Sequence, residues 1–290
     1  MRRQSKWPVA PYCKAATAHQ NWHKTPDDPC PDRELARLLS ARSGSWQDGA
    51  NVIFMLEDYF SLQLKFATHY AAKAAVPLDV AIDRCTNLRR RLNLWGDTGA
   101  SRWKFFLNKV KSAVDDRAEQ VALCAEFQQS LSYIEVKRSF GCFSYDPPDA
   151  YGTLRIHFVA PDGINSSPLA IENSSARRAD LQELISHVQR TEPRATTVRG
   201  VSWLYNLQAY RRLFPTAYSA SVQSARFPLH LNGSSTWGQV LNWRQEVKPD
   251  VRDQLLVRLN DMAVATPWLV FPLQALVATS QIEVFYDQFT

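Results

Sequence analysis

Four residues near the start of the chain have the types and spacing that a zinc site needs. Cys13, His19, His23 and Cys30 follow the pattern C-x5-H-x3-H-x6-C. On a helix, an H-x3-H pair places both imidazoles on one face, and two thiolates can complete the tetrahedral set that Zn²⁺ prefers. The cysteine spacing matches no common zinc finger, so the alternative is an arm with two free thiols and two surface histidines. Zinc is the one cofactor that the sequence suggests.

A second set of reactive side chains lies in the second half of the chain. The stretch LRIHFVAPDG alternates apolar and polar residues, as a half-buried strand does, and places Arg155 and His157 on one face. A histidine in such a position can act as a general base near neutral pH, and an arginine can hold a phosphate or carboxylate. The bland alternative is a hydrogen-bonded histidine at the edge of a sheet.

Further polar residues follow where SWLYNLQAYRR changes from strand to helix. This stretch and the strand before it contain Arg199, Ser202, Tyr205, Asn206 and Arg211. Together with the first strand they predict a pocket for a small anionic substrate. Its catalytic candidates are His157, Ser202 and Tyr205, and its anion-binding candidates are Arg155 and Arg211. The alternative for the aromatic residues is a place in the core.

The most basic part of the chain lies between residues 84 and 111, where Asp97 is the single acidic residue. Eight of these 28 positions are cationic, namely Arg84, Arg89, Arg90, Arg91, Arg102, Lys104, Lys109 and Lys111. Tryptophan and phenylalanine are interleaved with them. Nucleic-acid binding needs positive surface to displace counterions, and planar groups where bases stack. We therefore favour nucleic acid, or another polyanion, bound through this basic-aromatic ridge. The alternative is a solvated helix face with core aromatics behind it.

The excess of positive charge belongs to the first half of the chain. Residues 1–140 contain 21 Lys and Arg against 15 Asp and Glu, a difference of +6, whereas residues 141–290 contain 13 of each. Such asymmetry favours an anionic partner for the first half. A scaffold or interaction protein without catalysis is the third alternative.

The elements that position these residues fall into two parts. Apolar residues at helical spacing predict helices over 50–75, 79–93 and 101–131. From residue 133 the pattern predicts strands at 152–161 and 195–204, a helix over 175–193, another helix over 248–265 and a closing strand at 281–289. We expect an irregular arm at 1–31, a helical domain at 32–132 and an α/β domain at 133–290. The fold class is α+β or α/β, with an all-helical N-terminal part before a mixed sheet covered by helices.

Bulk composition indicates a folded protein of ordinary type. The hydrophobic fraction of 45% and the charged fraction of 21% suffice for a sizeable core. No apolar run reaches the length of about 18 residues that spans a bilayer. The basic N-terminus lacks the apolar stretch of a secretory signal, and five scattered cysteines do not resemble a disulfide framework. These features favour a cytoplasmic location and leave the oligomeric state open.

Overall fold

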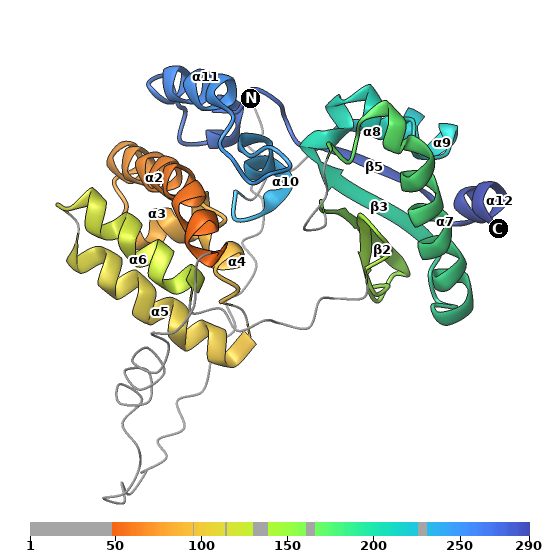
Figure 1. Ribbon diagram of the computed structural model, residues 1–290, viewed down its shortest axis with the longest axis horizontal. Coiled ribbons are helices and arrows are strands. Elements are labelled where there is room, and N and C mark those ends of the chain that lie inside the picture. The colour runs from red at the N-terminus through yellow and green to blue at the C-terminus, as the bar shows by residue number, and fades with distance from the viewer. Residues whose placement is uncertain (1–47, 95, 114, 130–138, 161–165, 226–230) are drawn as a thin grey trace, which may run out of the picture. The chain divides into compact units, whose positions relative to one another are not determined.

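The computed structural model describes residues 48–290 except 95, 114, 130–138, 161–165 and 226–230 (Figure 1). Its first helices are α2 (Asp48–Ala74), α3 (Leu78–Cys85), α4 (Leu88–Arg91), α5 (Gly96–Ser112) and α6 (Arg117–Gln129). The strands are β1 (Phe143–Asp146), β2 (Thr153–Phe158), β3 (Thr197–Ser202), β4 (Gln223–Ser224) and β5 (Leu276–Gln281). The predicted fold class, helices first and a mixed sheet after them, is confirmed. The predicted boundary near residue 132 lies outside the described residues.

Helices and short 3-10 turns separate and follow the strands. The later helices are α7 (Ser174–Thr191), α8 (Gln208–Arg211), α9 (Thr216–Ala220), α10 (Ser234–Trp237), α11 (Pro249–Leu259) and α12 (Glu283–Phe289). The 3-10 turns are η1 (Ile171–Asn173), η2 (Trp203–Asn206), η3 (Gly238–Val240) and η4 (Pro267–Val270). By its internal contacts, the chain from residue 47 to its end is one compact unit.

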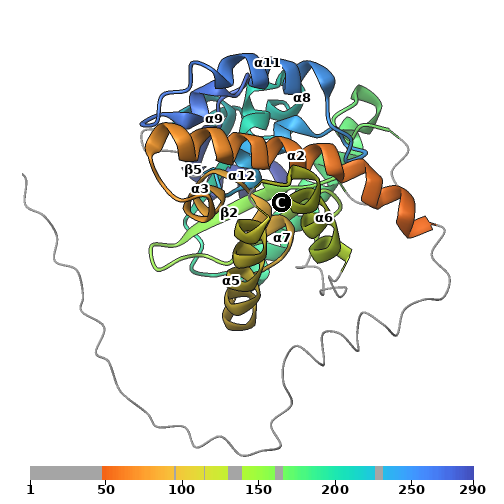
Figure 2. The ribbon, with the colours of Figure 1, turned by 90° about the vertical axis from the view of Figure 1, so that its left-hand side faces the viewer.

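The N-terminal helices pack around α2, which contacts both α3 and α6 (Figure 2). Leu56, Phe60, Leu64 and Ala67 recur at helical spacing and are buried, which is why this segment is a long amphipathic helix. The predicted helix over 79–93 is interrupted, since Thr86 is extended between α3 and α4.

Buried polar groups cause that interruption. The backbone N–H of Asn87 donates to Gln63 Oε1 at 2.9 Å instead of to a helical carbonyl. The Asn87 side-chain oxygen accepts from Tyr59 Oη at 3.0 Å and from Gln63 Nε2 at 2.8 Å. These bonds satisfy groups that would otherwise be costly to bury, and they turn α4 away from the axis of α3.

A late segment of the chain completes the helical core. Trp237 is fully buried, and its indole N–H donates to the Cys85 carbonyl at 2.9 Å. Its ring packs edge-on against Tyr59, Phe66 and Phe271. The segment from residue 231 to residue 248 is thereby placed beside α3 and α4.

The sheet has strand order β1-β2-β3-β5-β4, in which β2 and β3 are parallel and the other neighbours antiparallel. One face packs against α7 and α12, which lie together in Figure 1. Leu154, Ile156 and Val198 point into this core. The intervening residues, among them Arg155, His157 and Arg199, therefore lie on the opposite face.

The predicted closing strand at 281–289 is wrong, because Glu283–Phe289 forms helix α12. In so short a stretch, the apolar residues fit both the two-residue period of a strand and the 3.6-residue period of a helix. The buried set is Ile282, Phe285 and Phe289, which share one helical face. The last strand, β5, comes directly before α12 and has the sequence LVATSQ, which ends in polar residues.

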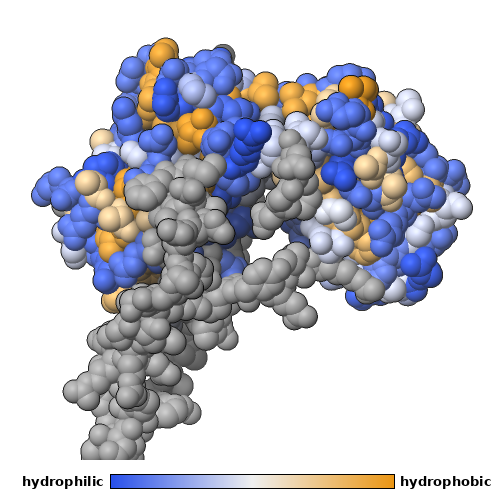
Figure 3. All heavy atoms as spheres, in the orientation of Figure 1, coloured by the Kyte–Doolittle hydropathy of each residue, from blue (hydrophilic) through white to orange (hydrophobic). Residues whose placement is uncertain are grey.

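In the described part of the chain, no helix combines the length and apolarity needed to cross a bilayer. Figure 3 shows a mostly hydrophilic surface on the side it presents, with apolar residues in scattered groups among the charged ones.

Close packing at Gly200 provides a test of the sheet core. A Cβ at this position would overlap the Tyr205 hydroxyl and lie 2.6 Å from the Tyr218 hydroxyl. We expect Gly200→Ala to lower the free energy of unfolding by about 1–3 kcal/mol, the usual cost of overpacking, in urea denaturation. Adding Tyr205→Phe to that variant should recover part of the loss. The matched control is Gly233→Ala, where the nearest atom to a Cβ is 4.0 Å away. Equal stability of the two glycine variants would contradict this packing.

Candidate functional site

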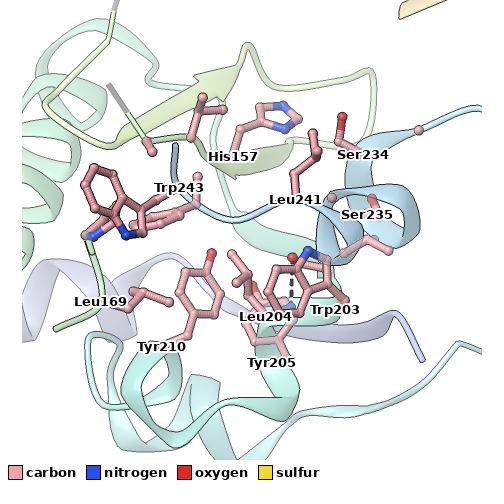
Figure 4. A pocket seen from close by; sticks show the side chains of 18 of the residues that line it. His157, Leu169, Trp203, Leu204, Tyr205, Tyr210, Ser234, Ser235, Leu241 and Trp243 are labelled. Carbon is pink, nitrogen blue, oxygen red and sulfur yellow. Dashed lines mark hydrogen bonds between the residues drawn. The ribbon is translucent and has the colours of Figure 1, made fainter. Parts of the chain in front are cut away.

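The open face of the sheet forms one wall of a cavity of about 920 Å³. The other walls come from α4, from the loop that follows β2, from η2 and α8, and from residues 233–248. Figure 4 shows His157 and Trp243 on one side of this cavity, with Tyr210 and Trp203 on the opposite side. A volume of this size accommodates a ligand as large as a drug or a nucleotide.

Strand register builds a row of charge across the floor of the cavity. Asp146 on β1 pairs with Arg155 on β2, and Arg155 pairs with Arg199 on β3. The next position on the β5 side is Thr279. Two arginines are thus nearest neighbours on adjacent strands, an arrangement that costs stability unless something compensates for it. Two backbone hydrogen bonds lower the pKa of the Asp149 carboxyl most, and the charges of Arg155 and Arg199 lower it further. Asp149 therefore offsets part of the positive charge of the two arginines.

Cations dominate the rest of the lining. Arg90, Arg91, Arg155, Arg199 and Lys248 all line the cavity. Among the described residues of the lining, Asp146 is the single acid. These five cations come from four separate segments of the chain, so their convergence is a property of the fold and not of one charged run. The cavity is therefore suited to an anionic ligand.

A histidine–carboxylate pair stands at the edge of the charged row. His157 Nε2 lies 2.8 Å from Asp146 Oδ2, and both side chains are about one-third exposed, at 37% and 35%. An ionised carboxylate can only accept, so this bond favours the histidine tautomer with its proton on Nε2. Nδ1 is then the nitrogen that can take a proton from a group bound in the cavity.

Planar side chains line the cavity beside these charges. Trp203, Tyr210 and Trp243 are partly or largely buried and face the common space in Figure 4. Lys248 Nζ lies 4.9 Å from the centre of the Trp203 ring, and the Arg244 guanidinium lies 4.6 Å from the Trp243 ring. Such cation–π contacts hold the indoles in place and set positive charge beside flat surfaces.

Arg91 on α4 links the N-terminal helices to the segment from residue 231 to residue 248, which completes their core. Its guanidinium donates from Nη2 to Gln245 Oε1 at 2.7 Å and lies 5.7 Å from the Tyr59 ring centre. Burial lowers the pKa of Arg91 and raises that of Tyr59 to about 12. A guanidinium remains charged over the physiological range, so Arg91 contributes a fixed positive charge to the wall.

The predicted anionic-substrate pocket is assembled only in part. Arg155, His157, Ser202 and Tyr205 line the same cavity. Arg211 is not among the lining residues and instead donates from Nε to the Tyr205 carbonyl at 2.6 Å.

The two hydroxyl candidates of that pocket make structural bonds. Ser202 Oγ accepts from the Leu204 N–H at 3.1 Å and thereby caps η2. Tyr205 is 1% exposed, and its hydroxyl lies 2.6 Å from the Tyr218 hydroxyl. Burial is the main cause that raises the pKa of Tyr205 well above its usual value, and the neighbouring Tyr218 is the second cause. These settings favour structural roles for both side chains, whereas His157 retains a partly exposed ring.

The predicted ridge divides between two surroundings. Arg90 and Arg91 line the cavity, whereas Arg84, Lys104 and Lys111 are exposed elsewhere on α3 and α5. Arg89 Nε donates to the Leu94 carbonyl at 3.1 Å, Arg102 is half-buried, and Lys109 lies 5.2 Å from the Phe105 ring centre.

The ridge aromatics divide in the same way. Trp103 and Phe106 are buried in the helical core, where they stack on each other. Phe105 is 39% exposed, and Trp95 lies outside the described residues. Of the three described rings, Phe105 is therefore the one with surface to offer a base.

The predicted zinc ligands Cys13, His19, His23 and Cys30 also lie outside the described residues. Within the described residues, no group of three or more potential ligands is close enough to hold a metal ion. The zinc site stays a prediction.

Asp146, Trp243 and Lys248 are among the lining residues that the sequence did not predict. Asp146 could have been found from the register of a β1–β2 hairpin around the proline pair that follows it. Trp243 and Lys248 could not, because only the return of residues 231–248 to the helical core brings them to the sheet.

Fold and site together define a mixed α+β protein with a cation-lined, aromatic cavity on the open face of its sheet. No protein-family model, no curated protein and no solved structure matches this chain.

The paired arginines yield a stability prediction. Because Arg155 and Arg199 repel each other across adjacent strands, we expect Arg199→Gln to raise the free energy of unfolding by roughly 0.2–1 kcal/mol at low salt. The gain should shrink as salt screens the repulsion. Thermal and urea denaturation would measure it, with Arg190→Gln on the exposed end of α7 as the matched control. A loss of more than about 1 kcal/mol in Arg199→Gln would indicate that this side chain supports the fold instead.

Proposed function

We propose that this protein binds nucleic acid, and that it does so by holding a nucleotide unit in the cavity on the open face of the sheet. The phosphate groups contact Arg155 and Arg199 on the sheet and Arg90 on α4. The base stacks against the tryptophans that line the opposite walls. The cavity recognises the phosphate and the base of one nucleotide unit, whether the nucleotide is free or part of a strand.

The observation that carries this proposal is the convergence of five cations on one cavity that has a single acid in its described lining. Arginine is suited to phosphate because its planar fork can donate two parallel hydrogen bonds. Strand register sets Arg155 opposite Arg199, so two side chains of like charge occupy adjacent strands, a pairing whose repulsion costs stability. A phosphate between them would turn that repulsion into attraction.

The aromatic lining separates a nucleotide from a simple anion. A phosphate or carboxylate alone requires cations, whereas Trp203 and Trp243 add flat apolar surface next to them. Stacking of a base on an aromatic ring contributes about 1–3 kcal/mol and tolerates any base. The proposal therefore concerns nucleotides without strong sequence preference.

The 84–111 ridge enters this proposal through Arg90 and Arg91. The other cations of the ridge line no part of the cavity, and Trp103 and Phe106 are buried. If the whole ridge binds the polyanion, the exposed cations of α5 are required for binding. If the cavity binds it, Arg155 and Arg199 are required instead.

Variants that neutralise charge distinguish binding in the cavity from binding along the whole ridge. We expect Arg155→Gln/Arg199→Gln to weaken binding of a labelled single-stranded oligonucleotide by about tenfold or more, measured by fluorescence anisotropy, because two charge-assisted bonds are lost. The slope of log affinity against log salt should become shallower by about 0.7 for each phosphate contact removed. The matched control, Lys104→Gln/Lys111→Gln, removes the same charge from exposed positions on α5. If this control loses the affinity instead, the ridge and not the cavity is the interface.

Stacking is tested with a pair of aromatic variants. We expect Trp243→Leu to weaken oligonucleotide binding by about 1–3 kcal/mol, whereas Phe105→Leu on the exposed ridge should leave it unchanged. Quenching of tryptophan fluorescence on binding gives a second readout. Competition by a nucleoside monophosphate would identify a single nucleotide as sufficient. Absence of binding to any single strand or nucleotide at low salt would refute the proposed function and leave the scaffold alternative.

A further inference from the structure

Anion binding in the cavity does not require the pair formed by His157 and Asp146. Arginine and lysine already supply permanent positive charge to the cavity, and a histidine bonded to a carboxylate adds little to it. The pair has instead the composition of an acid–base catalyst, in which a carboxylate orients an imidazole so that the other ring nitrogen can receive a proton.

Its position relative to the cations is what a phosphoryl-transfer site requires. Arg155 lies two residues before His157 on β2 and on the same face of the strand. Arg199 pairs with Arg155 on β3. A phosphate held by these two guanidinium groups would place its phosphorus near the imidazole, and the same two groups would stabilise the negative charge that grows on its oxygens.

We propose that the cavity cleaves a phosphodiester bond of a bound nucleic-acid strand, with His157 as general base and Asp146 as the positioning residue. This inference rests on the proposed function. His157 Nδ1 takes the proton from a hydroxyl nucleophile as its oxygen forms a bond to phosphorus. The bond from phosphorus to the leaving oxygen breaks, and that oxygen gains a proton from protonated His157 or from water.

The nucleophile has two sources with the same chemistry. If it is the ribose 2′-hydroxyl, the products are a cyclic phosphate and a 5′-hydroxyl, and no water is consumed. If it is water, the products are a phosphomonoester and a hydroxyl. RNA and DNA of one sequence separate the two cases, because DNA lacks the 2′-hydroxyl.

The experiment follows labelled RNA and DNA oligonucleotides with the full chain, in EDTA to silence contaminating metal nucleases, and measures binding in the same samples. We expect cleavage that falls about 10²–10⁴-fold in His157→Gln while affinity is retained. Glutamine can still donate to Asp146, so the variant should fold. His69→Gln on α2, away from the cavity lining, is the matched control and should cleave normally.

Asp146→Asn provides the readout that a structural role would not change. The amide carries no charge to balance the one that the imidazole gains as general base, so the cleavage rate should fall while the affinity for the oligonucleotide stays unchanged. Cleavage of RNA alone supports the 2′-hydroxyl route, and cleavage of both strands supports water. Binding without cleavage of either strand overturns this inference and leaves the proposed function intact. Cleavage that persists in His157→Gln also overturns it, whereas absence of binding refutes the proposed function itself.

Discussion

The side-chain alternation of β2 and β3 is the constraint on which the site depends. Leu154, Ile156 and Val198 must face α7 and α12 to build the sheet core. Because successive side chains of a strand point to opposite faces, their neighbours Arg155 and Arg199 have no other place than the open face. A slip of one residue in register would bury the two arginines and expose the core. The same register therefore determines both the fold and the cavity.

The open face also accounts for the kind of chemistry that the cavity offers. Sheets with one solvated face carry polar residues on that face. Here, the described lining concentrates cations from four segments around a single histidine–carboxylate pair. Paired like charges reduce stability, and proteins commonly accept such losses at functional sites. We therefore relate this concentration of cations to the anionic ligand of the proposed function.

Local pattern could predict much of this structure. The alternation in LRIHFVAPDG predicted β2 and the shared face of Arg155 and His157, and helical spacing predicted α2 and α7. It failed at α12, where seven residues fit either period. It also could not foresee that Trp237 would bind the Cys85 carbonyl, 152 positions earlier, and so carry Trp243 and Lys248 to the cavity. Such long-range packing depends on how whole surfaces fit, which local periodicity does not encode.

The central claim, that an anionic ligand contacts the cations of the open face, is tested most directly by arginine footprinting. Phenylglyoxal modifies accessible guanidinium groups, and mass spectrometry reads the extent at each position. With a bound oligonucleotide, we predict protection of Arg90, Arg155 and Arg199, with unchanged modification of Arg84 and Arg190. Protection of Arg84 and Arg102, with the sheet arginines modified as in the unbound protein, would contradict the account.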